Sequence, residues 1–194
     1  MEKVKNVKSI AVKFNLDDGI SPDVKSKKRV LSEMEGIYYN NEELKKMLSK
    51  GNPIVYEFYD LDIPESEGNI KFGTTILYPG KVGNEFFMTK GHFHEILDTA
   101  EIYYCIRGHG YMLMENTEGN VEVQEMTAGI SVYVPPGFAH RSINVSEKEP
   151  LISFFAYRAD AGHDYKTIEM KGFRKLVLEK GGKPDIIDNP KWIK

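Results

Sequence analysis

The chain has 194 residues, of which 41% are hydrophobic and 28% are charged, and its formal net charge is −3. This length fits one packed domain with appendages, and the weak negative charge argues against nucleic acid or an anionic membrane as the main partner. Cys105 is the only cysteine, which excludes a disulfide framework and is typical of a reducing cytosol. The N-terminus lacks a signal-peptide pattern, and no apolar run approaches the roughly twenty residues of a membrane helix. We expect a soluble cytoplasmic protein.

The first 52 residues form a predicted N-terminal extension. Alternating apolar side chains predict a strand over 8–14, and the acidic pair and glycine at 17–19 end it as a turn. Residues 22–36 are charged and ambiguous, with a short helix as one interpretation. The clearest helix covers 41–50, because an asparagine can cap its start, leucine and methionine form one stripe, and a glycine follows it.

From residue 53 onward the pattern changes to short strands separated by turns, with little helix. Residues 165–170 stay uncertain. Regular short strands of this kind are typical of an antiparallel sandwich or barrel. We therefore predict one mainly all-β domain over 1–194, with 53–160 as the barrel core and 161–194 as a C-terminal segment. The expected strands are 54–61, 70–78, 85–89, 100–106, 111–115, 121–126, 131–134, 142–145 and 151–157, followed by a hairpin of 173–179 with 185–187.

Two histidines one residue apart begin the candidate site. In a strand, His92 and His94 point to the same face, because side chains alternate with period two. If 100–106 is the next strand, Glu101 and Tyr103 share one face with Cys105. Imidazole and carboxylate are ligands for first-row divalent metal ions. We expect these groups to meet inside the barrel.

A second element follows, in which a Pro-Pro-Gly turn over 135–137 presents His140 at the start of a strand. Three histidines and one glutamate leave open positions on a six-coordinate metal ion, as a catalytic site requires. Other residues of this region favour a structural interpretation. His109 reads as a turn residue, Cys105 as a small core residue and Asn144 as a structural amide, while Glu95 and Asp98 read as solvated.

The two elements resemble the two motifs of the cupin superfamily. The second matches at Gly129, Pro135, Gly137, His140 and Asn144. The first departs, because Phe86 stands where glycine is usual and Glu101 follows His94 at a longer distance than usual. That longer spacing is similar to the archaeal cupin-type phosphoglucose isomerases. Further stretches that look like that family are 34–39, 73–75, 135–142 and 157–165.

This resemblance implies a cupin double-stranded β-helix, or jelly-roll barrel, in a homodimer. It implies the interconversion of glucose 6-phosphate and fructose 6-phosphate, a step of glycolysis and gluconeogenesis. One divalent metal ion per subunit is implied, with Fe²⁺ first and Ni²⁺, Zn²⁺ or Mn²⁺ as alternatives. The implied metal ligands are His92, His94, Glu101 and His140.

The expected mechanism is proton transfer through a cis-enediol(ate), with Glu101 as the base and the metal ion as a Lewis acid. Tyr103 would hydrogen-bond the substrate or the carboxylate, and His163 would assist ring opening. A hydride shift is the rival mechanism, and the sequence does not decide between them. Lys90 is a tempting phosphate-binding cation whose direction stays open. The implied substrate-binding residues are Thr75, Thr89, Gly91, Tyr103, Tyr157 and His163.

Two alternatives to the isomerase stay open at this point. An iron-loaded cupin with these ligands can run dioxygenase chemistry. A non-enzymatic sugar-binding cupin is the other alternative, because a fold does not fix a function. Tyrosines such as Tyr103 and Tyr157 could then be barrel packing with a solvated hydroxyl.

Overall fold

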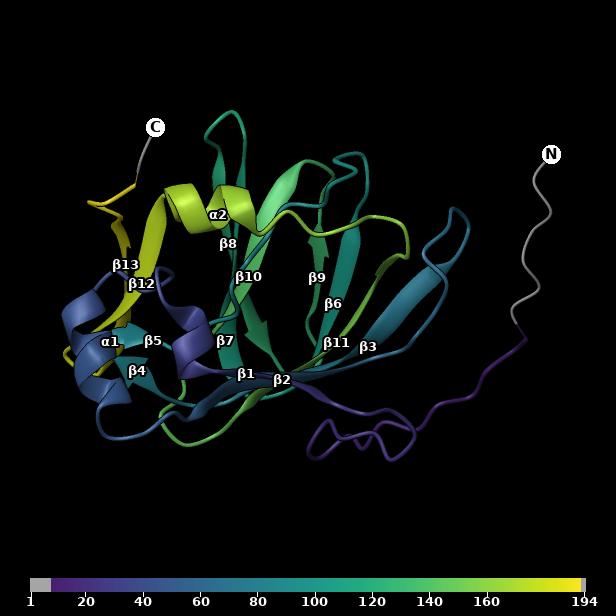
Figure 1. Ribbon diagram of the computed structural model, residues 1–194, viewed down its shortest axis with the longest axis horizontal. Coiled ribbons are helices and arrows are strands. Elements are labelled where there is room, and N and C mark those ends of the chain that lie inside the picture. Colours follow the sequence, from purple (N-terminus) through teal and green to yellow (C-terminus); the bar gives the residue numbers. More distant parts are fainter. Residues whose placement is uncertain (1–7, 193–194) are drawn as a thin grey trace.

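The computed structural model describes residues 8–192, and Figure 1 shows their arrangement. Strands dominate, and three antiparallel sheets carry the orders β1-β2-β3-β11-β6-β9, β10-β7-β8 and β13-β12-β5-β4. The mainly β prediction is confirmed. The strands are β1 Lys27–Val30, β2 Ile54–Asp60, β3 Ile70–Leu77, β4 Lys81–Val82, β5 Glu85–Phe86, β6 Glu101–Arg107, β7 His109–Asn116, β8 Val121–Thr127, β9 Ser131–Val134, β10 Phe138–Asn144, β11 Leu151–Arg158, β12 Lys175–Lys180 and β13 Lys183–Asp188.

The hydrophobic core lies between the six-stranded sheet and the three-stranded sheet. Fully buried side chains reach it from both sheets, for example Leu77 and Cys105 from the first and Met112 and Ile143 from the second. Each fully buried aliphatic side chain contributes roughly 1.5–3 kcal/mol relative to exposure. Packing of these side chains holds the two sheets together as a barrel, and the candidate site lies in the interior of this barrel.

The helices are short and peripheral. Helix α1 (Asn41–Leu48) begins as predicted, because the Asn40 side chain accepts a hydrogen bond from the Glu43 amide at 3.2 Å. A 3-10 helix covers Leu31–Met34. Helix α2 (Lys166–Lys171) occupies the segment that the sequence left uncertain. No helix in the described part of the chain is long and apolar enough to cross a membrane.

The predicted strand at 8–14 is wrong, because residues 8–15 belong to no strand. The alternation itself has a physical cause. Val12 and Phe14 are half-buried, and the Phe14 ring packs edge-on against Phe72 and Phe154, with centroids 6.5 and 6.1 Å apart. The Lys13 amide donates to the Asp23 side chain rather than to a neighbouring strand. The segment is therefore extended and packed on the sheet without joining it.

Two further boundaries differ from the prediction. Strand β5 ends at Phe86, and the segment that follows makes only isolated bridges, such as His92 with His140. Strand β10 begins four residues earlier than the predicted 142, at Phe138. The two regions predicted as appendages also enter the sheets, since β1 pairs with β2 and β12 pairs with β5. In Figure 1, β12, β13, α1, β4 and β5 gather at one end of the molecule.

Candidate metal and substrate site

Backbone pairing brings the first two ligands of the candidate metal site together. The His92 amide donates to the His140 carbonyl at 3.3 Å, and the His140 amide donates back at 3.1 Å. Glu101 is the first residue of β6 and enters the same interior. One ligand atom from each of His92, His94, Glu101 and His140 lies within 4.8 Å of all the others. The structure thus brings together all four predicted metal ligands.

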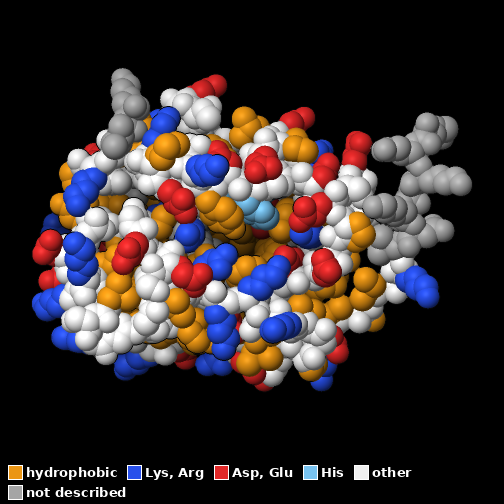
Figure 2. Space-filling model, viewed as in Figure 1, with side chains coloured by type: hydrophobic (Ala, Val, Ile, Leu, Met, Phe, Trp, Pro, Cys, Tyr) orange, Lys and Arg blue, Asp and Glu red, His pale blue; other side chains and the backbone are white. Residues whose placement is uncertain are grey.

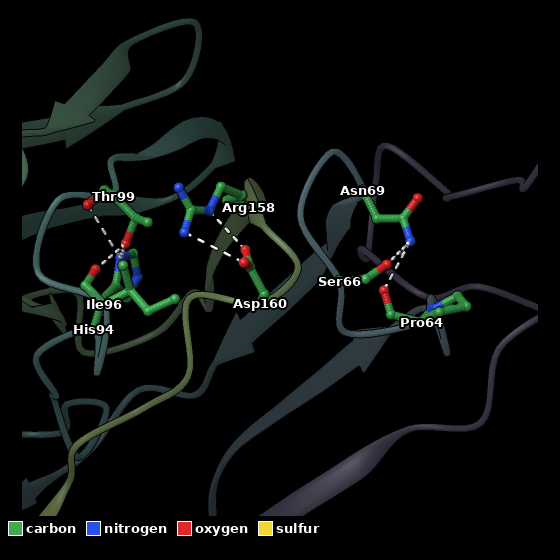
Figure 3. A network of polar contacts seen from close by, with 8 residues as sticks. All are labelled: Pro64, Ser66, Asn69, His94, Ile96, Thr99, Arg158 and Asp160. Carbon is green, nitrogen blue, oxygen red and sulfur yellow. Dashed lines mark hydrogen bonds and ion pairs between the residues drawn. The ribbon is translucent and has the colours of Figure 1, made fainter. Parts of the chain in front are cut away.

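The orientation of His94 is fixed by Thr99, as Figure 3 shows. His94 Nδ1 lies 2.7 Å from Thr99 Oγ1 and 3.2 Å from the Thr99 carbonyl oxygen. The Thr99 hydroxyl donates its own proton to the Ile96 carbonyl at 2.6 Å, so it accepts from the imidazole. His94 Nδ1 therefore carries the proton, and His94 Nε2 keeps a free electron pair.

That electron pair faces another acceptor. Glu101 Oε2 lies 3.1 Å from His94 Nε2 and 3.1 Å from His140 Nε2. His92 Nε2 and both His140 ring nitrogens are buried without a hydrogen-bond partner among the described residues. Burial would raise the pKa of the Glu101 carboxyl, yet its electrostatic interaction with His140 holds it well below its usual value. Converging buried acceptors of this kind fit a divalent cation, because a cation satisfies all of them at once.

A cavity of about 300 Å³ opens above the ligands. Figure 2 shows a histidine beside a hollow in this face, with basic and acidic side chains around it. The cavity is lined by all of the predicted substrate-binding residues, which are Thr75, Thr89, Gly91, Tyr103, Tyr157 and His163. A cavity of this volume accommodates a small polar metabolite.

Burial keeps two titratable side chains beside the ligands neutral near pH 7. Burial, with Glu101 adding to the effect, raises the pKa of Tyr103 well above its usual value, so the phenol stays a hydrogen-bond donor. Burial lowers the pKa of His163 to about 4, so its imidazole is neutral near pH 7. The His163 ring centroid lies 4.4 Å from that of His92. The site therefore offers a neutral donor and a neutral imidazole next to the carboxylate.

Comparison with known proteins decides the family. The model of the family described as glucose-6-phosphate isomerase (GPI) matches residues 28–191. The chain belongs to the glucose-6-phosphate isomerase family. A glucose-6-phosphate isomerase of Thermococcus litoralis is 51% identical over 93% of this chain and 95% of its own length. One of Pyrococcus furiosus is 48% identical over 94% of this chain and 96% of its own length.

A solved structure of an oxalate oxidase shows a more distant likeness. Its TM-score is 0.48 at 15% identity, and the match covers 59% of this chain and 56% of that chain. A likeness this distant says nothing about chemistry. The family assignment of this chain therefore rests on the sequence relatives.

The cavity of this chain is also lined by residues that the sequence analysis did not assign to the site. Arg29 from β1, Tyr56 from β2 and Tyr165 beside α2 line it, together with Asp60 and Lys71. The available signal was the period-two alternation of β2, but alternation alone does not say which face of a strand turns inward. The charged residues of β1 lie in the segment 22–36 that the sequence left ambiguous, where no strand was predicted.

The Lys90 side chain, whose direction the sequence left open, pairs with helix α2. Its ammonium lies 3.0 Å from the Glu169 carboxylate of α2, at the edge of the cavity. Asn144 is a structural amide, as predicted, whereas His109 is the first residue of strand β7 rather than a turn residue. His109 pairs with Glu125 at 2.8 Å on the exterior, and the Asn144 amide donates to the carbonyls of Leu77 and Glu149. Neither residue belongs to the metal cluster.

Proposed function

We propose that this chain interconverts glucose 6-phosphate and fructose 6-phosphate with one divalent cation per subunit. The observation that carries the proposal is the cluster of four ligand atoms at the base of a cavity, in a member of the glucose-6-phosphate isomerase family. Family membership favours this reaction over a dioxygenase or a non-enzymatic sugar-binding protein. The bound cation would act as a Lewis acid that lowers the energy of negative charge on the sugar oxygens.

Glu101 is the proposed base. Its Oε2 atom faces the imidazoles of His94 and His140, so Oε1 is the atom that would take the proton from C2 of the open-chain aldose. Return of that proton to C1 through a cis-enediol completes the conversion to the ketose. Tyr103 is two residues further along the same face of β6 and would donate a hydrogen bond to the substrate or to Glu101.

His163 would assist the opening of the sugar ring. Its neutral imidazole can accept a proton from the anomeric hydroxyl at neutral pH, because burial keeps its pKa low. The segment that carries it is fixed upstream by Arg158, whose Nε donates to Asp160 at 2.6 Å (Figure 3). Beside this segment, the Ala159 amide donates to the Asn69 carbonyl, and the Asn69 side chain donates to Ser66 and Pro64 in the turn before Lys71.

Hydroxyl and backbone donors would hold the phosphate. Thr75, Thr89 and Tyr157 supply hydroxyls, and Gly91 supplies an amide on a backbone with φ of 77°. The Lys90 ammonium is already paired with Glu169, so we expect it to contribute less to phosphate binding than these donors. Fe²⁺ is the metal ion we expect first, ahead of Ni²⁺, Zn²⁺ and Mn²⁺, all of which accept imidazole and carboxylate ligands.

The subunits would form a homodimer in the cytoplasm. An exposed apolar surface supports the dimer. Ile102, Tyr104 and Tyr133 are 44%, 44% and 60% exposed on β6 and on the edge strand β9. Contiguous exposed apolar side chains at a sheet edge favour contact with a second copy.

A coupled assay tests the proposed activity. Fructose 6-phosphate is supplied, and formation of glucose 6-phosphate is followed with glucose-6-phosphate dehydrogenase, before chelation, after chelation and after return of each metal ion. We expect chelation to abolish activity and one of the four metal ions to restore it. Absence of activity above background in the metal-replete protein would show that the isomerase proposal is wrong.

A further inference from the structure

Arg141 is a buried cation that the proposed chemistry does not use. It follows His140 on β10 and is 3% exposed. Among residues 8–192, no carboxylate oxygen lies within 4.0 Å of its guanidinium, so it forms no direct ion pair. Glu85 and Glu115 act on it only from beyond that distance. Burial lowers the pKa of Arg141 to about 10. Burial of a charge without a direct ion pair is costly, so the contacts that the guanidinium does make require an explanation.

Those contacts converge on the turn before His92. Arg141 Nη2 donates to the Lys90 carbonyl, and Nη1 lies 3.0 Å from the Met88 sulfur. The guanidinium carbon stacks 4.3 Å from the centroid of the Phe173 ring. A cation on an aromatic face and a charge-assisted hydrogen bond to a carbonyl together offset part of the burial cost.

The turn itself is pressed against this stack. Gly91 has φ of 77°, and a Cβ atom there would lie 2.6 Å from the Phe173 ring and 3.0 Å from Arg141 Nε. Only glycine fits that space and that left-handed backbone without strain. The position of Gly91 is therefore set by the Arg141 guanidinium and the Phe173 ring.

Strand β10 holds the same turn from its other face. The Thr89 amide donates to the Ser142 carbonyl at 3.0 Å, and the Ser142 amide donates to Thr89 Oγ1 at 3.1 Å. Thr89 and Gly91 both line the cavity, and His92 follows directly. Arg141 thus completes a clamp in which one strand fixes the turn on two sides.

We propose that Arg141 is a positioning residue for substrate binding, and that it orders residues 89–91 through the Lys90 carbonyl and the Phe173 ring. The identity of the substrate rests on the proposed function, whereas the ordering of the turn does not. Loss of the guanidinium would leave the ligand set in place but free the turn, so substrate affinity would fall more than turnover.

Three variants separate positioning from general stability. Arg141→Met keeps an unbranched apolar stem against Phe173 and removes the donors, without leaving a buried charge. Arg141→Lys keeps one donor that can reach the Lys90 carbonyl, so it tests rescue. Glu115→Gln is the control for the loss of a buried charge near the guanidinium. Glu115 is also buried, on the neighbouring strand β7, and acts on Arg141 through its charge, but its side chain contacts the Arg174 amide rather than the turn.

The measurements are hydrogen–deuterium exchange of peptides spanning 88–93, together with KM and kcat for fructose 6-phosphate in the metal-replete protein. For Arg141→Met we expect at least tenfold faster exchange in the turn and about a tenfold rise in KM, with kcat within about threefold. Arg141→Lys should recover part of both effects. The Glu115→Gln control should match the wild type in both measurements.

Wild-type exchange in the turn of folded Arg141→Met would overturn the proposal. So would equal changes in Glu115→Gln, because the effect would then report stability alone. If Arg141→Met does not fold, Phe173→Leu loosens the same stack from the other side, and its exchange decides the same question. If wild-type protein shows no isomerisation, the proposed function fails, while the exchange data still decide the role of Arg141.

Discussion

His92 and His140 exchange two backbone hydrogen bonds, although they lie far apart in the chain. This pairing fixes the distance between their imidazoles without any contribution from the metal ion. The site is therefore preorganised, and each ligand is expected to contribute to affinity rather than to folding.

Substitution of His140 by alanine should remove most metal binding. Removal of a group that only hydrogen-bonds to a metal ligand typically lowers metal affinity by roughly 10–100-fold. Loss of a ligand itself should therefore lower it by at least about 100-fold. Metal content after dialysis against a weak chelator, measured by mass spectrometry, checks this. His109→Ala is the control, because His109 is solvent-exposed and paired with Glu125. Equal metal content in the two variants would contradict the assigned ligand set.

Thr99→Val should weaken metal binding while leaving every ligand in place. The substitution removes the hydroxyl that accepts from His94 Nδ1 at 2.7 Å and leaves only the Thr99 carbonyl at 3.2 Å, so the imidazole is held less firmly in its tautomer and orientation. We expect an affinity loss of roughly 10–100-fold, measured by competition with a coloured chelator. Thr117→Val, in the exposed turn between β7 and β8, serves as the control. Unchanged affinity in Thr99→Val would show that Thr99 does not orient the ligand.

Glu101→Gln should lower kcat by roughly 10²–10⁴-fold, the range that general acid–base catalysis supplies. The amide keeps the shape of the side chain but cannot take a proton. Binding of fructose 6-phosphate, measured by calorimetry in the metal-loaded variant, should persist. Turnover within tenfold of the wild type in a metal-loaded sample would exclude Glu101 as the base.

Glu85 should make the protein less stable as the pH rises. Burial raises the pKa of its carboxyl from 4.5 to about 7, so the folded state holds a proton that the unfolded state has lost. Stability should therefore fall between about pH 4.5 and 7, by about 3 kcal/mol in total. Urea unfolding across this range checks the sign. The Glu85→Gln variant should lack this component, and parallel curves for the two proteins would contradict it.

Tyr133→Asp should convert the dimer to monomers, because it places a charge on the exposed apolar surface of β6 and β9. Light scattering at a fixed protein concentration gives the mass. Ile186→Asp is the control, since Ile186 is an exposed apolar residue of β13, which belongs to another sheet. A monomeric wild type would show that the dimer proposal is wrong.

The cluster of the four candidate ligands could be predicted from the sequence because it depends largely on local rules. Alternation along β6 places Glu101 and Tyr103 on one face, and the Pro-Pro-Gly turn leads directly into the strand of His140. The predicted strand 85–89 ends at Phe86, and His92 and His94 belong to no strand. Bridges to His140 and to Asp164, across the barrel, hold that segment instead.

Long-range packing explains what the sequence could not indicate. Nothing in the sequence indicated that Arg141 is buried, because the ring that it packs against is that of Phe173, which lies after α2. Arg29 entered the cavity only because β1 pairs with β2, and nothing local distinguishes that charged segment from a solvated loop. The fold class followed from strand length and turn spacing, but the inward faces followed from tertiary pairing.

The most direct test of the account is nuclear magnetic resonance of fructose 6-phosphate conversion by the metal-replete protein in D₂O. Proton transfer through Glu101 predicts glucose 6-phosphate that carries deuterium at C2, with no conversion after chelation. Product formed without any deuterium at C2 would point to a hydride shift or a base closed to solvent, and no product above background would contradict the isomerase itself.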